Sequence, residues 1–282
     1  MNAEDGPTVL VALSNPRTES ALVTLAGALA EREGGRVLAT HVVTVPDQTA
    51  LEKAAENRAA LDDSSEELLA AAAADAEAFD ATVETRTILS HRGIEEVFDA
   101  ARTNDADAVV MGYGGARFAG GRVEGSLDEL ARDLPCDFLV LDGGRLDPRA
   151  LSDVLVPTAG GPSSDLSAEV ARALREVLDV DVSLLYVADP GDEEAGREFL
   201  LEWAESHGLD DATLRVEIGD VEETIGRLGE AYDLVIVGAT ERGLLSRIVR
   251  GSLAYDAIEA LDAPVLLSER PSSRTLWERL LG

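Results

Sequence analysis

The feature that most constrains this chain is a glycine-spaced loop that occurs twice, in residues 112–126 and again in residues 238–252. Each copy follows a short apolar run and precedes an amphipathic segment, and this order indicates a strand, a loop and a helix. Glycines let backbone amides approach a ligand closely, and a helix start adds unpaired N–H groups and a positive dipole. Both loops are therefore candidate phosphate sites.

The repeat extends beyond the loops. Residues 9–11 match residues 154–156, and residues 41–42 match residues 186–187, both at an offset of 145, whereas the two loops lie 126 residues apart. The second copy is thus 19 residues shorter, mainly because the first copy carries an extra segment at residues 49–78. A fixed order of elements with one change of length indicates a duplicated domain.

Strands alternate with helices in both halves, and the unbroken apolar runs suit parallel strands covered on both faces. This predicts an α/β fold of two tandem doubly wound domains, each with a five-stranded parallel sheet. The domains are predicted at residues 1–145 and 150–270, and a tail helix is predicted at residues 271–282. Trp277 of this tail either docks on the body, which we favour, or marks a surface for a partner. Strands are predicted at residues 8–13, 36–43, 82–89, 108–112, 138–142, 153–157, 181–188, 214–218, 234–238 and 265–267, and first-half helices at residues 17–33, 51–78, 94–103 and 126–134.

The charge of the chain is extreme, because 55 acidic against 24 basic residues give a net charge of −31. The acids are spread over helical faces, and Lys53 is the sole lysine. We interpret this surface as that of a halophilic protein, because the high salt of a halophilic cytosol screens the repulsion between like charges. Nucleic acid and anionic membranes need a basic footprint and are excluded as partners.

No apolar run reaches the roughly 20 residues of a membrane span, and residues 1–8 do not resemble a signal peptide. The expected location is the cytoplasm.

Groups that could catalyse a reaction are hard to find. The loops contain no Walker lysine, no Gly-x-Ser-x-Gly elbow occurs, and no histidine has a partner at metal-ligand spacing. We therefore predict that the chain is not an enzyme and holds no metal site of its own. His41 is expected to flank the pocket and Cys136 to be a small core residue, while Asp105, Asp107 and Asp220 are expected to be solvated acids.

At these loops the chain resembles the universal stress protein family. Its ATP-binding members carry G-x2-G-x9-G-(S/T) after the fourth strand, and residues 112–126 match that motif completely. His41-Val42 at the end of the second strand and a Pro-Cys before the last strand extend the resemblance. It implies an ATP site in the first domain, with or without Mg²⁺. The residues that it places around the nucleotide are Ala12, Leu13, Ser14, Val42, Met111, Gly112, Gly115, Gly125, Ser126 and Leu127.

Some positions depart from the family pattern. ATP-binding relatives hold an Asp at the end of the first strand, and this chain holds Ser14 there, so the contribution of a carboxylate is lost. In the second half Ala159 takes the Asp position and Glu241 replaces the second glycine, which restricts the backbone and repels phosphate. The arginines of that loop either bind phosphate or pair with acids; they are Arg242, Arg247 and Arg250. We expect the nucleotide in the first half and a structural duplicate in the second.

Three hypotheses for the function follow. The leading one is a non-catalytic protein that binds ATP or another adenine nucleotide in stress response or regulation. The alternative is a nucleotide-free regulatory or scaffolding module, for example one that modulates a transporter, and a weak ATP hydrolase or transferase ranks third. The resemblance also implies that the two halves pair through their last strands, and that two chains associate again. The physical reason is that the apolar edges at residues 138–141 and 265–267 should be covered.

Overall fold

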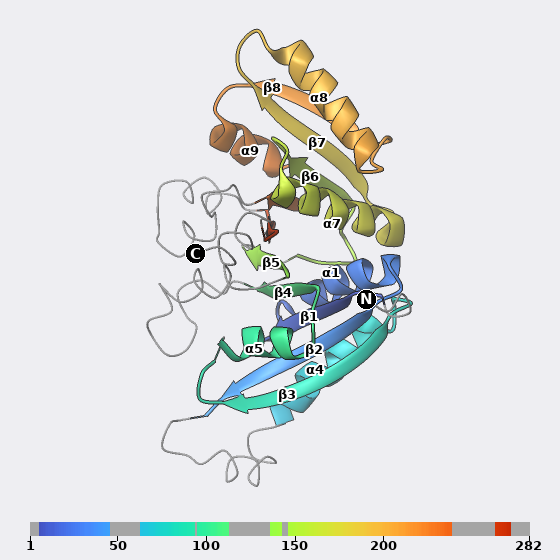
Figure 1. Cartoon of the computed structure of the whole chain (residues 1–282), viewed down its shortest axis with the longest axis vertical. Coiled ribbons are helices and arrows are strands. Elements are labelled where there is room, and N and C mark those ends of the chain that lie inside the picture. Colours follow the sequence, from blue (N-terminus) through green and yellow to red (C-terminus); the bar gives the residue numbers. More distant parts are fainter. Residues whose placement is uncertain are drawn as a thin grey trace, which may run out of the picture. The chain divides into compact units, whose positions relative to one another are not determined.

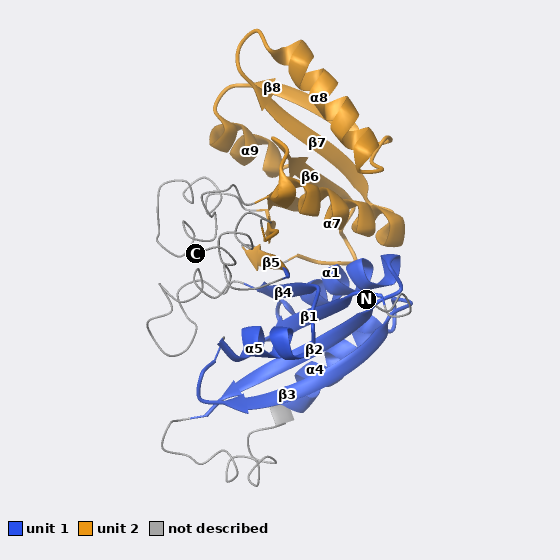
Figure 2. Cartoon of the chain, viewed as in Figure 1, with its two compact units in different colours: residues 1–112, 134–136 blue, residues 113–133, 137–282 orange. Residues whose placement is uncertain are grey.

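The computed structural model describes residues 6–45, 63–93, 95–112, 136–142, 146–238 and 263–271. Strands and helices alternate along the chain (Figure 1). By their contacts the described residues fall into two compact units (Figure 2). Unit 1 holds the residues up to 112 together with Cys136, and unit 2 holds those from 137 onward. The last strand of the first half of the sequence therefore belongs to unit 2.

Unit 1 contains a parallel sheet of strand order β3-β2-β1-β4. Its strands are β1 (Thr8–Leu13), β2 (Arg36–Thr44), β3 (Thr82–Ser90) and β4 (Ala108–Gly112), and its helices are α1 (Glu19–Arg32), α4 (Asp63–Ala76) and α5 (Glu95–Thr103). Right-handed crossovers place α1 and α4 on one face and α5 on the other, because the chain reverses its direction across the sheet after β3. The fully buried Leu10 and Val11 of β1 lie at the centre of this core.

Unit 2 contains a sheet of strand order β5-β10-β9-β6-β7-β8. Its strands are β5 (Asp137–Asp142), β6 (Asp153–Pro157), β7 (Asp181–Ala188), β8 (Thr213–Ile218), β9 (Leu234–Gly238) and β10 (Val265–Glu269), and its helices are α7 (Pro162–Leu178), α8 (Glu193–Ser206) and α9 (Val221–Gly229). The order β9-β6-β7-β8 repeats that of β4-β1-β2-β3 in unit 1, as a duplicated domain requires. All pairings in it are parallel except the one between β5 and β10.

The last strands of the two halves pair with each other in antiparallel orientation. Val265 lies opposite Asp142, and Glu269 lies opposite Phe138. Leu139 and Leu266 at the middle of this pair are completely buried. The pairing of the halves through their last strands is thus confirmed, and each apolar edge is covered by the other. Cys136, which precedes β5, is buried as predicted for a core residue.

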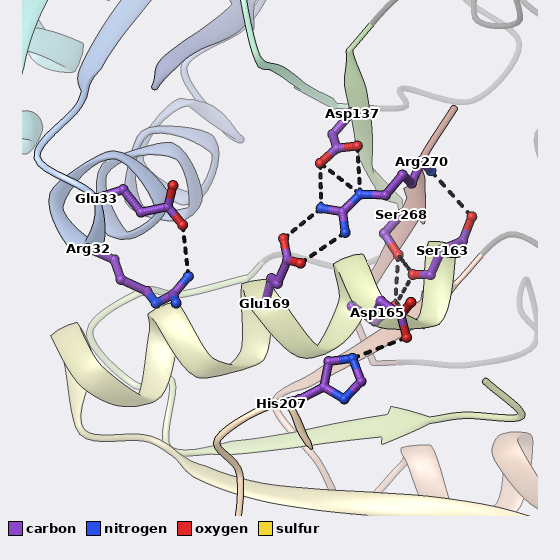
Figure 3. A network of polar contacts seen from close by, with 10 residues as sticks. Arg32, Glu33, Asp137, Ser163, Asp165, Glu169, His207, Ser268 and Arg270 are labelled. Carbon is purple, nitrogen blue, oxygen red and sulfur yellow. Dashed lines mark hydrogen bonds and ion pairs between the residues drawn. The ribbon is translucent and has the colours of Figure 1, made fainter. Parts of the chain in front are cut away.

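Arg270, just beyond β10, binds two carboxylates at one end of this strand pair (Figure 3). The Arg270 guanidinium donates from Nε to both carboxylate oxygens of Asp137, at 3.0 and 3.2 Å, and from Nη2 to Oδ2 at 2.7 Å. It also donates from Nη1 and Nη2 to Glu169 on α7, at 2.9 and 2.6 Å. The hydrogen bonds with Glu169 and Asp137 raise the pKa of Arg270 above its ordinary value. Arg270 therefore ties β5 and α7 to the end of β10.

Two aspartates, one just before β4 and one just before β9, accept hydrogen bonds from the backbone at the start of the neighbouring strand. Asp107 Oδ2 accepts from the amide of Thr8 at 2.9 Å. At the equivalent position of unit 2, Asp233 Oδ2 accepts from the amides of Ser152 and Asp153, at 2.8 and 3.0 Å, and from the Ser152 hydroxyl at 2.9 Å. Burial works to raise the pKa of Asp233, but these hydrogen bonds outweigh it and the pKa lies below its ordinary value.

The expected exposure of Asp105, Asp107 and Asp220 is confirmed, but two of these carboxylates also bind backbone amides. Asp107 is exposed but binds β1, and Asp220 is exposed but caps α9 by accepting from the amide of Glu223 at 3.0 Å. The physical reason is that strand starts and helix starts carry unpaired backbone N–H groups, for which a short carboxylate is a strong acceptor.

The predicted strands agree with the observed ones to within two residues at each end. The helix predicted at residues 17–33 begins later, at Glu19, because the Asn15 side chain accepts from the amide of Arg17 at 2.8 Å and holds a turn there. Of the helix predicted at residues 51–78, the structure describes Asp63–Ala76, and residues 51–62 lie outside the described residues. The helix predicted at residues 126–134 and the tail helix with Trp277 also lie outside them.

Candidate functional site

The carboxyl ends of the parallel strands of unit 1 form the edge at which the sequence predicts a nucleotide. From β1 the chain moves outward to β2 and β3 and then returns to β4 on the other side of β1. In open α/β sheets, ligands bind outside the carboxyl ends of the strands at such a reversal. Ala12 pairs with Met111 across it, one residue before each strand ends. The topology thus directs a ligand to the ends of β1 and β4.

The described part of the chain contains six of the ten predicted binding residues, and it brings them to this edge. Leu13 and Met111 are buried, and Ser14 is exposed directly after β1. The other three are half-buried near the strand ends; they are Ala12, Val42 and Gly112. Gly115, Gly125, Ser126 and Leu127 lie outside the described residues. The strand-borne part of the predicted site is therefore a contiguous row on three adjacent strands.

A histidine of β2 binds the end of β1. Nδ1 of His41 on β2 lies 2.7 Å from the carbonyl oxygen of Leu13, the last residue of β1. Because a carbonyl oxygen accepts only, Nδ1 carries the proton. Nδ1 of His91 makes the corresponding bond to the carbonyl oxygen of Val45, at 2.9 Å. The sequence predicts that His41 flanks the pocket, but it does not predict this bond, which depends on the register between β1 and β2.

The two first glycines of the motifs lie in different surroundings. A Cβ added at Gly112 would lie 3.4 Å from Thr18 Oγ1 and 3.6 Å from Leu22 Cδ1, which are ordinary side-chain contacts. A Cβ added at Gly238 would lie only 2.7 Å from the backbone of Ser163 and Ser164 in the first turn of α7. Thr18 and Ser163 are equivalent at the 145-residue offset. The helix backbone therefore approaches the strand end more closely in unit 2 than in unit 1.

Buried serines fasten this helix turn in unit 2 (Figure 3). The hydroxyl of Ser268 on β10 lies 2.7 Å from that of Ser167 and donates to the carbonyl oxygen of Ser163 at 3.0 Å. Ser167 and Ser268 are completely buried. The start of α7 is thus bound directly to the end of β10, beside the strand ends that would hold a second ligand. Glu241 and the three loop arginines lie outside the described residues.

Unit 1 carries a buried carboxyl group in the first turn of α1. The Glu19 side chain is buried, and its Oε1 atom has no hydrogen-bond partner. Burial, with a smaller contribution from the charge of Asp75 on α4, raises the pKa of Glu19 from 4.5 to about 7. The carboxyl is therefore largely protonated below neutral pH. The sequence pattern does not indicate this burial, because an acid in the first turn of a helix is normally exposed and interacts with the helix dipole.

A cavity of about 340 Å³ lies elsewhere, at the amino ends of strands in unit 2. It is lined by Leu146, Asp147, Ala150, Glu230, Tyr232, Asp233, Ala263 and Pro264. These residues precede β6, β9 and β10, so the cavity lies at the end of the sheet opposite to the motif loops. The carboxylate of Asp233 is already engaged with the start of β6.

Two further searches cover the described residues alone. Among them, no helix combines the length and the apolar character needed to cross a membrane. In the same part of the chain, no three side chains of His, Cys, Asp or Glu gather closely enough to hold a metal ion.

Comparisons with known proteins agree with this fold. The chain shares 16% identity and a TM-score of 0.63 with a universal stress protein from Archaeoglobus fulgidus DSM 4304, over 94% of this chain and 97% of that one. The cytoplasmic domain of a prokaryotic cation chloride cotransporter shares 13% identity and a TM-score of 0.58, over 93% and 95%. An A. fulgidus universal stress protein solved with dAMP shares 20% identity and a TM-score of 0.31, over 45% of this chain and 88% of that one.

No curated protein matches the chain. The model of the universal stress protein family matches it twice, over residues 7–142 and 151–268. These two matches span most of the sequence and coincide with the two repeats. The chain therefore belongs to the universal stress protein family.

Proposed function

We propose that unit 1 binds ATP or another adenine nucleotide at the carboxyl ends of β1 and β4, and that the chain is a non-catalytic regulatory protein of the stress response. The observation that carries the proposal is the position of Gly112. It ends β4 at the reversal of strand order and opens the complete glycine motif, which the sequence continues through residue 126. A phosphate chain there would meet backbone amides and a helix start.

The proposal assigns the site to the first half and not to the second. Gly112 has ordinary side-chain neighbours, whereas Gly238 lies against the backbone of α7, which is held in place by Ser268. The loop that follows Gly238 also carries Glu241 where the motif has its second glycine. A carboxylate repels phosphate, so both features disfavour a second nucleotide.

Titration calorimetry with ATP tests the proposal, with and without Mg²⁺, in molar KCl so that the acidic chain stays folded. Binding of one nucleotide per chain is expected. Gly125→Glu should abolish it, whereas Gly251→Glu, the same change at the equivalent position of the second half, should leave it unchanged. No heat with the wild-type protein would refute the proposal and favour the nucleotide-free scaffold. Loss of binding in both variants would contradict the assignment to the first half.

The end of β1 offers a second test, in the direction of tighter binding. Ser14 is exposed at the position where ATP-binding relatives, by the resemblance, hold an Asp. Ser14→Asp should tighten ATP binding about tenfold, because a hydrogen bond to a carboxylate is stronger than one to a hydroxyl. Ala159→Asp, at the equivalent position of the second half, is the matched control and should not change the affinity. Phosphate release by the wild-type protein would contradict the non-catalytic part of the proposal.

A further inference from the structure

The outer strand of unit 1 is a long and exposed edge. β3 has nine residues, stands at the end of the strand order, and among the described residues pairs with β2 on one side. Its sequence, TVETRTILS, is rich in β-branched residues, and Thr82, Glu84, Thr85 and Arg86 are exposed. An edge of this kind is a template for another strand, because its outward N–H and C=O groups are available.

The charges on this edge select a partner and a register. If a second β3 pairs antiparallel with Thr85 opposite Thr85, then Glu84 lies opposite Arg86 of the second copy, and Arg86 lies opposite its Glu84. Opposite charges that face each other directly across a strand pair are stabilising, and like charges are destabilising. A register shift of two residues, which keeps the same faces together, places Glu84 opposite Glu84 in one direction and Arg86 opposite Arg86 in the other. The pattern Glu-Thr-Arg is therefore self-complementary in one register only.

The charged groups of β3 make exposed contacts. Arg86 donates from Nη1 to Oδ1 of Asn104 at 3.0 Å. Glu84 accepts from Arg36 at 3.4 Å, with side-chain exposures of 49% and 44%. An ion pair this exposed contributes little and can rearrange. On the six-residue β8, by contrast, the guanidinium of Arg215 lies 5.9 Å from the ring of Tyr232, and Glu217 accepts from Arg227 at 3.1 Å. β3 is thus the longer of the two outer strands, and the contacts of its charged groups are exposed to solvent.

We propose that β3 is an interaction surface for a second copy of this chain, joined antiparallel about a two-fold axis that passes through Thr85. The last strands of two chains cannot form such an interface with each other, because β5 and β10 already pair within each chain. Two copies with a net charge of −31 each repel at low salt. At 1 M salt the screening length is about 3 Å, so the long-range repulsion between the two copies disappears. The backbone hydrogen bonds between the two edge strands do not depend on that screening. Dimerisation is therefore expected to increase with KCl.

Cysteine cross-linking tests the register. Thr85→Cys places a thiol opposite its own copy, whereas Thr87→Cys, on the same face of the same strand, places the two thiols about 13 Å apart along the strands. With a short bifunctional thiol reagent in molar KCl, the first variant should yield covalent dimers and the second should yield few. The wild-type protein, whose one cysteine is buried, gives the background. Equal yields from the two variants, or none from Thr85→Cys, would overturn the proposal.

Charge reversal tests the interface without a cross-link, by sedimentation in molar KCl. Glu84→Arg should shift the protein towards monomer, since it places arginines opposite arginines. The double variant Glu84→Arg with Arg86→Glu restores opposite charges in the same register and should restore the dimer. Circular dichroism checks that each variant is folded. A wild-type protein that stays monomeric from low to molar KCl, or a dimer that Glu84→Arg leaves unchanged, would show that β3 is not the interface.

Discussion

Replacing Glu19 by Gln should stabilise the protein at alkaline pH and have a much smaller effect at acid pH. The folded chain buries the Glu19 carboxyl near Asp75, and its pKa rises from 4.5 to about 7. Between these two values the folded state binds a proton that the unfolded state releases. Stability from this group is therefore complete below about pH 4.5 and is lost as the pH rises to about 7. Gln is neutral at every pH and is not subject to this loss.

The size of the effect follows from the pKa shift. One unit corresponds to about 1.4 kcal/mol, so at pH 8 an ionised Glu19 costs the folded state about 3 kcal/mol relative to a group without the shift. At pH 5 the same linkage gives a cost of about 1 kcal/mol. The advantage of Glu19→Gln over the wild-type protein should therefore grow by about 2 kcal/mol from pH 5 to pH 8. Any difference in stability between the Glu19→Gln variant and the protein with a protonated Glu19 is the same at both pH values, so it cancels from the difference between pH 5 and pH 8.

Urea unfolding in molar KCl, followed by circular dichroism at pH 5 and pH 8, measures the change. The comparison is between two proteins at each pH, so the titration of the other acids cancels. Glu67→Gln removes an exposed carboxylate from α4 and serves as the control, with no pH-dependent gain expected. A Glu19→Gln variant whose advantage is the same at both pH values would refute the reasoning, since it would mean that Glu19 is ionised without cost in the folded state.

Three other substitutions have defined outcomes in the same unfolding assay. Arg270→Ala removes the guanidinium that binds the carboxylates of Asp137 and Glu169. It should lower the free energy of unfolding by about 2 kcal/mol, because these groups are partly exposed and solvent limits the loss. An unchanged urea midpoint would contradict this expectation. Gly238→Ala forces a methyl against helix backbone and should cost about 1–3 kcal/mol, whereas Gly112→Ala should cost less; equal losses would refute the difference in surroundings. Asp233→Ala removes an acceptor of three hydrogen bonds and should destabilise more than Asp107→Ala, which removes an acceptor of one; the reverse order would be incompatible with the bonding described.

Much of the fold could be predicted because parallel strands covered on both faces consist of continuous apolar runs. Residues such as Val109 and Val235 are buried on both sides, and their runs mark the strands almost to the residue. The residues that join strands and helices carry no such local signal. Arg270 follows β10 as one more charged residue, and its role depends on Asp137, 133 residues earlier. The acids before β4 and β9 looked like solvated surface for the same reason.

The candidate site was predictable to the extent that it lies on strand ends. Ala12, Leu13 and Met111 meet at the carboxyl edge because register and topology require it. What could not be predicted is how closely a helix approaches that edge. The difference between Gly112 and Gly238 depends on the first turns of α1 and α7, which differ by a threonine and a pair of serines. The burial of Glu19 could not be predicted either, because an acid in the first turn of a helix is normally exposed.

The antiparallel pair of β5 and β10 has a consequence for how such a protein can change over time. In a dimer of two identical chains, every substitution at a symmetric interface appears twice. In a single chain that carries both partners, it appears once. Arg270 binds Asp137 at one end of the strand pair, whereas Val265 lies opposite Asp142 at the other end, so the two ends are not alike. Covalent linkage also keeps the strands at a high effective concentration, so dilution does not separate them. Each half is therefore free to change its side of the strand pair independently of the other.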